Sequence, residues 1–343
     1  MTANLAFIGF GVVGQGLAEI LLEKEKELEA KNDFTFRVVA ICDTLKGSIN
    51  NPEGIDLKAA LEAVKAGTKL DEAGLAGETG WDAITTIRES NADLVLEATY
   101  TDIKTGEPAV SHCRVALKSG KDLATTNKGP VALHFPELDE LASDNGLHFR
   151  YEGTVMSGTP VINLCAETLA GCEIKSIRGI LNGTTNYILS EMESGLSYDD
   201  ALKQAQELGY AEAGPDADVL GWDAMAKVII LANTQMGADL TTEDIDCTGI
   251  TEISLEDVNA AVAEGFRWKL IGSVSREGDK VVGRVAPEKI ALSDPLAAVM
   301  GPTNALTFDT DLLGPVTVQG AGAGRLETGF SLLTDILAIH RMR

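Results

Sequence analysis

The chain is poor in basic residues. Among its 343 residues, 28 are lysine or arginine and 52 are aspartate or glutamate, so the formal net charge is −24. Binding to nucleic acid or to an anionic membrane surface depends on clustered lysine and arginine. The excess of acidic residues opposes such binding. We therefore expect neither nucleic acid nor a membrane as a partner.

The sequence also lacks export and metal-binding signals. Its N-terminus has no basic stretch followed by an apolar core and a small-residue cleavage site, and no apolar run is long enough to span a bilayer. The four histidines are scattered, and the five cysteines are an odd number without metal-ligand spacing. These features predict a cytoplasmic protein with reduced thiols and without a zinc or iron site.

Glycine, in contrast, is concentrated directly after the first apolar strand, 5–8. The segment 9–16 reads Gly-Phe-Gly-Val-Val-Gly-Gln-Gly and runs into a predicted helix at about 15–31. A dinucleotide site requires this order of strand, glycine turn and helix, in which the phosphates meet the helix N-terminus. The predicted cofactor-binding residues of the turn are Gly9, Phe10, Gly11, Val12, Val13 and Gly14.

Strands and helices alternate through the first half of the chain. Strands are predicted at 36–41, 93–98 and 121–125, with a helix at 105–119. This alternation implies a parallel sheet with right-handed crossovers. Residues 66–80 are rich in small side chains and predict a mobile surface excursion.

Polar residues stand where two of these strands end. Asp43 is placed to accept hydrogen bonds from the adenine ribose, and the alternative is that it is a turn residue at the strand end. Because Lys46 is near enough to tolerate a 2′-phosphate, the choice between NAD and NADP stays open. Asn127 and Lys128 follow the strand at 121–125, at the carboxyl edge where ligands of open α/β folds bind.

From about residue 151 the pattern changes to an α+β type. A strand is predicted at 174–181, helices at 184–194, 197–208 and 222–236, and two further strands on either side of the turn 277–280. The helix at 222–236 follows an acid-rich loop. Asp223 and Lys227 are four residues apart and share one helix face. Charge beside the apolar run 228–232 costs free energy unless it is paired or used, and the alternative is a surface ion pair.

Taken in this order, the motifs resemble those of homoserine dehydrogenases. The matching segments are 9–16, 126–128, 152–155, 158–160, 179–189, 208–227 and 320–324. Asn-Gly-Thr-Thr-Asn at 182–186 and the acid-rich segment that ends at Lys227 are the most specific. The resemblance implies a short form without a kinase or a C-terminal regulatory domain, which interconverts L-homoserine and L-aspartate 4-semialdehyde with NAD or NADP in threonine and methionine biosynthesis.

The resemblance also implies an architecture. It is an α/β fold with a Rossmann-type dinucleotide-binding domain at 1–150, to which about 315–343 returns, and an α+β catalytic and dimerisation domain at 151–314. A homodimer is expected. The alternatives are a related dehydrogenase of another small hydroxy or oxo amino acid and a non-catalytic dinucleotide-binding sensor.

The site residues follow from the same motifs. The catalytic candidates are Lys227, Lys128 and Asp223, and the acids expected to hold the substrate and its ammonium group are Glu212 and Asp218. Asn182, Gly183 and Thr184 start a helix and can offer N–H groups to an anion, although capping that helix is their alternative role. The resemblance further places Gly322 and Gly324 at the cofactor, and a sodium ion on the carbonyls of Glu152, Val155, Ser157 and Thr159.

Overall fold

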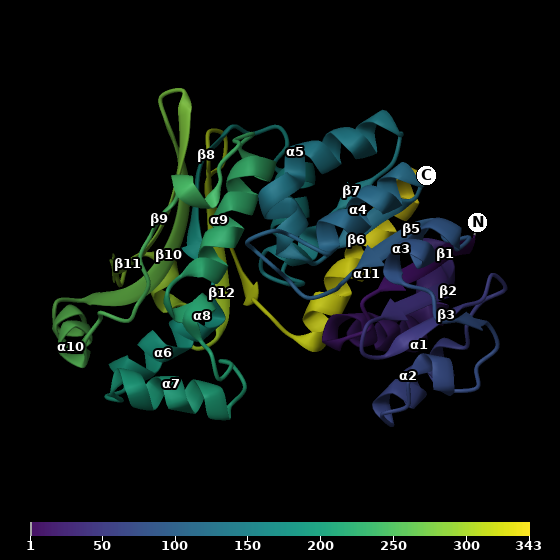
Figure 1. Ribbon diagram of the computed structural model, residues 1–343. Coiled ribbons are helices and arrows are strands. Elements are labelled where there is room, and N and C mark those ends of the chain that lie inside the picture. Colours follow the sequence, from purple (N-terminus) through teal and green to yellow (C-terminus); the bar gives the residue numbers. More distant parts are fainter. Residues whose placement is uncertain (1) are drawn as a thin grey trace. The chain divides into compact units, whose positions relative to one another are not determined.

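The computed structural model describes residues 2–343 and divides into two compact units (Figure 1). The first unit comprises the residues up to Gly158 together with Gly324–Arg343. The second unit is Thr159–Ala323. The boundaries predicted from the sequence, at 150 and about 315, differ from these by several residues. The roles predicted for the two domains remain predictions.

The first unit contains a seven-stranded sheet in the order β4-β3-β2-β1-β5-β6-β7. Its strands are β1 (Thr2–Ile8), β2 (Thr35–Asp43), β3 (Gly47–Asn50), β4 (Glu78–Thr79), β5 (Leu94–Glu97), β6 (Asp122–Thr125) and β7 (Phe149–Arg150). The neighbours β2, β1, β5, β6 and β7 pair parallel with one another. Residues 5–8 of β1 and 94–96 of β5 are buried apolar runs, as strands covered on both faces require.

The predicted parallel sheet is confirmed for β2, β1, β5, β6 and β7, and the strands at one edge depart from it. β3 pairs antiparallel with β2, and β4 pairs antiparallel with β3. The connection from Asp43 to Gly47 is too short for a parallel crossover, so the chain must return as a hairpin. β4 lies in the segment 66–80, where Leu70 is also buried, so this predicted surface excursion contributes to the sheet and the core.

Helices flank this sheet. They are α1 (Val12–Asn32), α2 (Leu57–Lys65), α3 (Ala83–Glu89), α4 (Ala109–Lys118), α5 (Lys128–Asp144) and α11 (Arg325–Met342). Side chains of α1, α2 and α11 share one apolar cluster with the sheet. A Cβ on Gly16 would stand 2.2 Å from the Arg325 carbonyl oxygen, and one on Gly329 would stand 2.6 Å from the Leu17 nitrogen. The C-terminal helix therefore returns to α1 at a contact that two glycines permit (Figure 1).

The second unit contains a six-stranded sheet in the order β13-β12-β8-β10-β11-β9. Its strands are β8 (Ile174–Ile180), β9 (Asp246–Cys247), β10 (Phe266–Glu277), β11 (Lys280–Ala291), β12 (Thr303–Thr310) and β13 (Gly314–Ala321). All neighbours are antiparallel except β11 and β9. The predicted strands around the turn 277–280 are the hairpin β10–β11.

The helices of the second unit are α6 (Gly183–Glu193), α7 (Tyr198–Glu207), α8 (Asp216–Val219), α9 (Trp222–Gln235) and α10 (Leu255–Ala263). α9 packs on β10 and β11 (Figure 1), and its apolar run 228–232 is buried. The α/β class with a second sheet unit is confirmed. Within residues 2–343, none of the helices has both the length and the apolar character needed to cross a membrane.

Candidate active site

The turn after β1 needs glycine at two positions for the fold and leaves a third open. Gly9 has φ +97°, and a Cβ there would lie 2.4 Å from the Ala98 carbonyl oxygen. A Cβ on Gly14 would lie 2.5 Å from the Gly9 carbonyl oxygen. A Cβ on Gly11 would meet nothing within 4 Å. Gly11 therefore has open space beside its backbone, and the approach of a pyrophosphate there remains a prediction.

The same turn presents the N-terminus of α1. Gly11 is the N-cap and has no side chain to accept a hydrogen bond, and the first helical bond runs from the Gln15 nitrogen to the Gly11 oxygen at 3.0 Å. The N–H groups of Val12, Val13 and Gly14 consequently have no acceptor inside the helix. Aligned N–H groups and the positive end of the helix dipole fit a phosphate anion.

Asp43 fastens the glycine turn to the end of β2. Its Oδ2 accepts a hydrogen bond from the Phe10 nitrogen at 2.8 Å, and its Oδ1 accepts from the Leu45 and Lys46 nitrogens, both at 2.9 Å. Asp43 therefore has the role given above as the alternative, that of a turn residue at the strand end. Each carboxylate oxygen has two lone pairs, so contact with a ribose remains a compatible prediction.

Asn127 and Lys128 stand where β6 meets α5. The Asn127 side chain caps α5 through the Gly129 nitrogen at 3.0 Å and donates to the carbonyl oxygens of Thr99 at 3.3 Å and Tyr100 at 2.8 Å. Its amide thus ties together the loops that follow β5 and β6. Lys128 is the first residue of α5 and is partly exposed.

Beneath these loops lies a buried carboxylate that sequence reasoning missed. Glu97 ends β5, is 0 % exposed, and accepts hydrogen bonds from the Thr99 hydroxyl and from the Thr125 hydroxyl at 3.0 Å. The Nδ1 atom of His112 lies 3.5 Å from the same carboxylate. An acid at the end of an apolar strand was the available signal. Glu97 holds the ends of β5 and β6 in register with each other.

The second unit brings a lysine, two acids and an amide together. The Nζ of Lys227 donates to the Leu181 carbonyl oxygen at 2.5 Å and to the Asp223 carboxylate at 2.7 Å. The Nδ2 of Asn182 donates to Asp218 at 2.6 Å and to Asp223 at 3.0 Å. The predicted sharing of one helix face by Asp223 and Lys227 is present, and the pair is an ion pair with a largely buried lysine.

The electrostatics of this cluster favour a cation. Burial raises the pKa of Asp218, Asp223 adds to that rise, and the Asn182 hydrogen bond and Lys227 oppose it. Counting Asp218 and Asp223 as anions and Lys227 as a cation leaves one negative charge in a partly buried place. One further positive charge neutralises this partly buried site.

Near the cluster, the start of α6 serves the fold. Asn182 caps the helix by accepting from the Thr185 nitrogen at 2.9 Å, and the Thr184 hydroxyl donates to the Tyr210 oxygen at 2.6 Å. A Cβ on Gly183 would lie 2.6 Å from the Pro302 oxygen. The predicted capping role of Asn182 is therefore present. Anion binding by the N–H groups of Gly183 and Thr184 remains a prediction.

Glu212 is a further predicted substrate residue. It lies in an exposed loop between α7 and α8, where its carbonyl oxygen accepts from Gln206 Nε2 at 3.0 Å. Its role in substrate binding stays a prediction.

The C-terminal glycines predicted at the cofactor lie in the stretch that links β13 to α11. A Cβ on Gly322 would lie 2.2 Å from the side chain of Asn304, so glycine is required there by packing. Gly324 has φ +141° and precedes α11. Packing at Gly322 and the backbone conformation of Gly324 explain why both residues are glycine. Contact of these glycines with a cofactor remains a prediction.

The predicted sodium ligands begin in the loop after β7. Glu152, Val155 and Ser157 are buried in the first unit, and Thr159 opens the second. Met156 and Ser157 both have left-handed backbones, with φ 58° and 56°, so the chain turns sharply there. Carbonyl oxygens suit a hard cation such as sodium. Within residues 2–343, His, Cys, Asp and Glu side chains form no group of three or more that could hold a metal.

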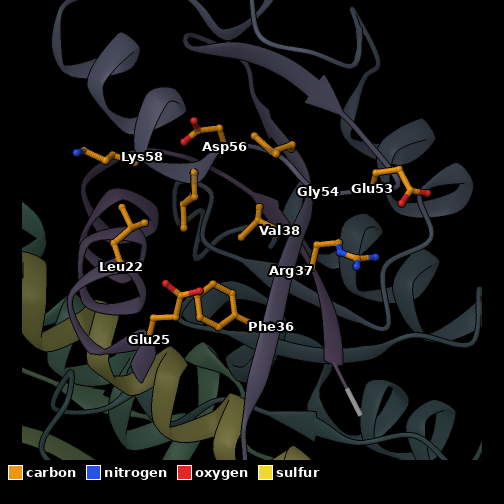
Figure 2. Close-up of a pocket in the computed structure, with 11 residues that line it drawn as sticks. Leu22, Glu25, Phe36, Arg37, Val38, Glu53, Gly54, Asp56 and Lys58 are labelled. Carbon is orange, nitrogen blue, oxygen red and sulfur yellow. The ribbon is translucent and has the colours of Figure 1, made fainter. Parts of the chain in front are cut away.

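A pocket of about 340 Å³ lies elsewhere in the first unit, among α1, β2 and the loop before α2 (Figure 2). Its lining mixes apolar side chains such as Phe36 and Val38 with charged ones such as Glu25 and Arg37. None of the predicted site residues lines it. This pocket is therefore not the predicted dinucleotide site.

A glycine turn on a largely parallel sheet, with a buried lysine paired to a carboxylate in a second unit, fits the class of dinucleotide-dependent oxidoreductases. The family model described as the NAD binding domain of homoserine dehydrogenase matches residues 9–152, and the model described as homoserine dehydrogenase matches residues 160–337. The chain belongs to the homoserine dehydrogenase family.

Individual relatives agree with this assignment. The NAD(+)-dependent homoserine dehydrogenase of Pseudomonas canavaninivorans is 47% identical over 98% of this chain and 96% of its own length. A crystal structure of a putative homoserine dehydrogenase from Archaeoglobus fulgidus has a TM-score of 0.88 at 40% identity, covering 98% of this chain and 99% of that one. A hyperthermophilic archaeal homoserine dehydrogenase in complex with NADPH has a TM-score of 0.85 at 31% identity, covering 100% of this chain and 99% of that one.

These comparisons confirm the predicted family and the predicted enzyme class, an NAD(P)-dependent oxidoreductase. They do not favour a dehydrogenase of another amino acid or a sensor without activity.

Proposed function

We propose that the chain oxidises L-homoserine to L-aspartate 4-semialdehyde with NAD(P), and catalyses the reverse reaction, with Lys227 exchanging the proton of the substrate oxygen. The observation that carries this proposal is the ammonium group of Lys227, held by a carbonyl oxygen and by Asp223. When bound, the nicotinamide accepts a hydride from the carbon that bears the hydroxyl. The alcohol proton must then pass to a base.

Lysine suits both directions of this reaction. Reduction of the aldehyde puts negative charge on its oxygen, and an ammonium group stabilises that charge and supplies the proton. An ordinary lysine side chain has a pKa of ~10.4 and is charged at neutral pH. Alkaline conditions therefore assist the oxidation, because the lysine must be neutral to take the proton. Lys128 is the second candidate for the substrate oxygen.

The acids of the second unit are proposed to bind the ammonium group of the substrate. Asp218 and Asp223 leave one negative charge beside Lys227, and a substrate ammonium neutralises it. Glu212 is proposed to join them from its exposed loop. The N–H groups of Gly183 and Thr184 at the start of α6 are proposed to hold the substrate carboxylate.

We propose that NAD is the preferred cofactor. Asp43 is a carboxylate at the end of β2, and three backbone N–H groups fix its position. A 2′-phosphate next to this carboxylate would be repelled. The relative from Pseudomonas canavaninivorans is named as NAD(+)-dependent, whereas the archaeal structure contains NADPH, so the preference must be measured.

A homodimer, a cytoplasmic location and a bound sodium ion complete the proposal. The five cysteines are free thiols, as a reducing compartment requires. Light scattering on the purified protein tests the dimer, since a mass of twice 36.2 kDa is expected.

One assay tests the activity. L-Homoserine is added to the purified protein with NAD or NADP at alkaline pH, and the absorbance of the reduced nicotinamide is followed. L-Serine and L-threonine serve as matched substrates. We expect turnover with L-homoserine and a higher kcat/KM with NAD. No reduction of either cofactor would refute the proposed activity, and a preference for another hydroxy amino acid would change the substrate.

A further inference from the structure

A second buried lysine lies in the unit that contains Lys227. Lys269 is in β10, is 0 % exposed, and belongs to the largest fully buried side chains of the protein. Ile271, Leu296 and Val299 belong to the buried apolar cluster of the same sheet region. A lysine rarely occupies such a place unless its ammonium group is bound. The proposed chemistry makes no use of it.

The ammonium group of Lys269 has specific acceptors. Its Nζ donates to the Asn186 Oδ1 at 2.9 Å and to the Val299 carbonyl oxygen at 2.6 Å, and the Met300 sulfur lies 3.5 Å away. Burial lowers the pKa of Lys269 to about 8, with Glu193 opposing and Arg267 adding to the effect. The lysine donates hydrogen bonds in either protonation state.

Asn186 connects Lys269 to the loop that precedes β12. Its Nδ2 faces the carbonyl oxygens of Gly301 at 2.8 Å and of Val299 and Thr303, both at 3.2 Å. Because Lys269 requires an acceptor, it fixes the Asn186 amide with its oxygen toward β10 and its nitrogen toward the loop. The second asparagine of the Asn-Gly-Thr-Thr-Asn motif is thereby explained.

The loop and α6 are also joined at two other points. Ser190 Oγ donates to the backbone carbonyl oxygen of Asn186 at 2.7 Å and accepts from the backbone nitrogen of Gly301 at 3.1 Å. At the start of α6, Gly183 packs so closely on Pro302 that a Cβ would stand 2.6 Å from its oxygen. A shift of the loop must therefore move the first turn of α6.

That first turn carries Asn182, which binds both Asp218 and Asp223. Asn182 and Asn186 are one helical turn apart and are joined by the backbone bond from the Asn186 nitrogen to the Asn182 oxygen at 3.3 Å. A continuous series of hydrogen bonds thus runs from Lys269 through Asn186 and Asn182 to the ion pair of Lys227.

We propose that Lys269 is a positioning residue of the substrate site, which fixes Asn186 and the loop 299–303 and thereby the N-terminus of α6 on which Asn182 orients Asp218 and Asp223. This inference rests on the proposed function of those acids and of Lys227. Lys269 acts through other residues, because its side chain is fully buried and its ammonium group donates to Asn186 and Val299.

The principal test replaces Lys269 by methionine, which has a similar length and no donor. Lys280→Met, at the exposed turn of the same hairpin, is the matched control. We expect Lys269→Met to lower kcat/KM for L-homoserine by about 10- to 100-fold, because a small misplacement of positioning groups has effects of this order. Both a higher KM for homoserine and a lower kcat are expected. The KM for NAD should stay within about twofold, because the glycine turn belongs to the other unit.

Two further variants separate positioning from folding. Lys269→Gln restores neutral donors and should recover part of the loss. Asn186→Asp keeps an acceptor for Lys269 and removes the donors to Gly301 and Thr303, so it should resemble Lys269→Met in kcat/KM.

Three outcomes would overturn the positioning role. They are a folded Lys269→Met or Asn186→Asp protein with a wild-type kcat/KM for homoserine, an equal loss in affinity for NAD, and failure of all three variants to fold, which would assign the network to stability alone. Wild-type protein that does not oxidise homoserine would instead contradict the proposed function.

Discussion

The two units present their functional groups in different ways. In the first, backbone atoms of contiguous residues do so: Gly9, Gly11 and Gly14 shape a turn whose N–H groups start α1. In the second, side chains from separate segments do so: Asn182, Asp218 and Lys227 meet through hydrogen bonds. A backbone site is sensitive to added volume, whereas a side-chain site is sensitive to loss of charge or of a donor.

The largest expected effect concerns the side-chain site. Lys227→Ala should lower kcat with homoserine by roughly 10² to 10⁴, the range for loss of a general acid or base. Affinity for NAD, measured by fluorescence titration, should persist because the variant alters a different unit. Lys203→Ala, on the exposed face of α7, is the control and should behave as wild type. A near-normal kcat in Lys227→Ala would exclude the proton-exchange role.

The backbone site is tested by adding a methyl group at two of its glycines. Gly9→Ala combines φ +97° with a Cβ placed 2.4 Å from the Ala98 oxygen, so the free energy of unfolding should fall by about 2–4 kcal/mol. Gly11→Ala has room within the protein and should lower the free energy of unfolding by only about 0.5–1 kcal/mol, as a poorer N-cap, while weakening NAD binding. Denaturant titration and fluorescence measure the two effects.

The contrast between these two glycines is the informative result. A stable Gly9→Ala would show that the turn can relax away from Ala98. Unchanged NAD affinity in Gly11→Ala would mean that the phosphates do not approach that residue.

Glu97 is the place where the first unit depends on a buried side chain. The two oxygens of Glu97 each accept from one hydroxyl, Oε1 from Thr99 and Oε2 from Thr125, so Glu97→Gln puts an amide nitrogen in place of one of these acceptors. An unsatisfied donor or acceptor should lower the free energy of unfolding by about 1–3 kcal/mol. Because these hydroxyls hold the loops after β5 and β6, NAD affinity should fall as well. Glu89→Gln, on the exposed part of α3, is the control. Unchanged stability would show that the ends of these strands do not require the carboxylate.

The parts that could be predicted from sequence have determinants close together in the chain. The glycine turn depends on a few adjacent residues, and the ion pair of Asp223 and Lys227 follows from the spacing within one helix. Lys269 could not be placed, because its acceptors on Asn186 and Val299 come from distant segments. The choice of a partner for a buried polar group is made by tertiary packing, which a local pattern does not record.

The same reason explains the sheet edge and the amide cluster. The hairpin of β2 and β3 followed from a short connection in a stretch where alternation suggested parallel strands. Asn182 could be predicted as a helix cap, whereas its bonds to Asp218 and Asp223 join segments far apart in the chain.

One expected effect on stability has the opposite sign to the others. Burial raises the pKa of Asp218 above its ordinary value, so the folded state binds a proton more readily than the unfolded state does. Stability from this group is therefore present at low pH and is lost as pH rises through the folded pKa. At neutral pH the charged carboxylate of Asp218 therefore lowers the free energy of unfolding. Asp218→Asn keeps the Asn182 hydrogen bond and should raise the free energy of unfolding by about 1 kcal/mol.

The cost of Asp218→Asn should appear in substrate binding. Without this carboxylate, Asp223 and Lys227 are neutral as a pair, and the substrate ammonium loses the charge that attracts it. We expect the KM for L-homoserine to rise by about tenfold or more, since hydrogen bonds to charged groups contribute about 1.5–3 kcal/mol. Denaturant titration at acid and neutral pH, together with steady-state kinetics, measures both effects. A variant less stable at neutral pH, or one with an unchanged KM, would show that Asp218 is retained for the fold and not for the substrate.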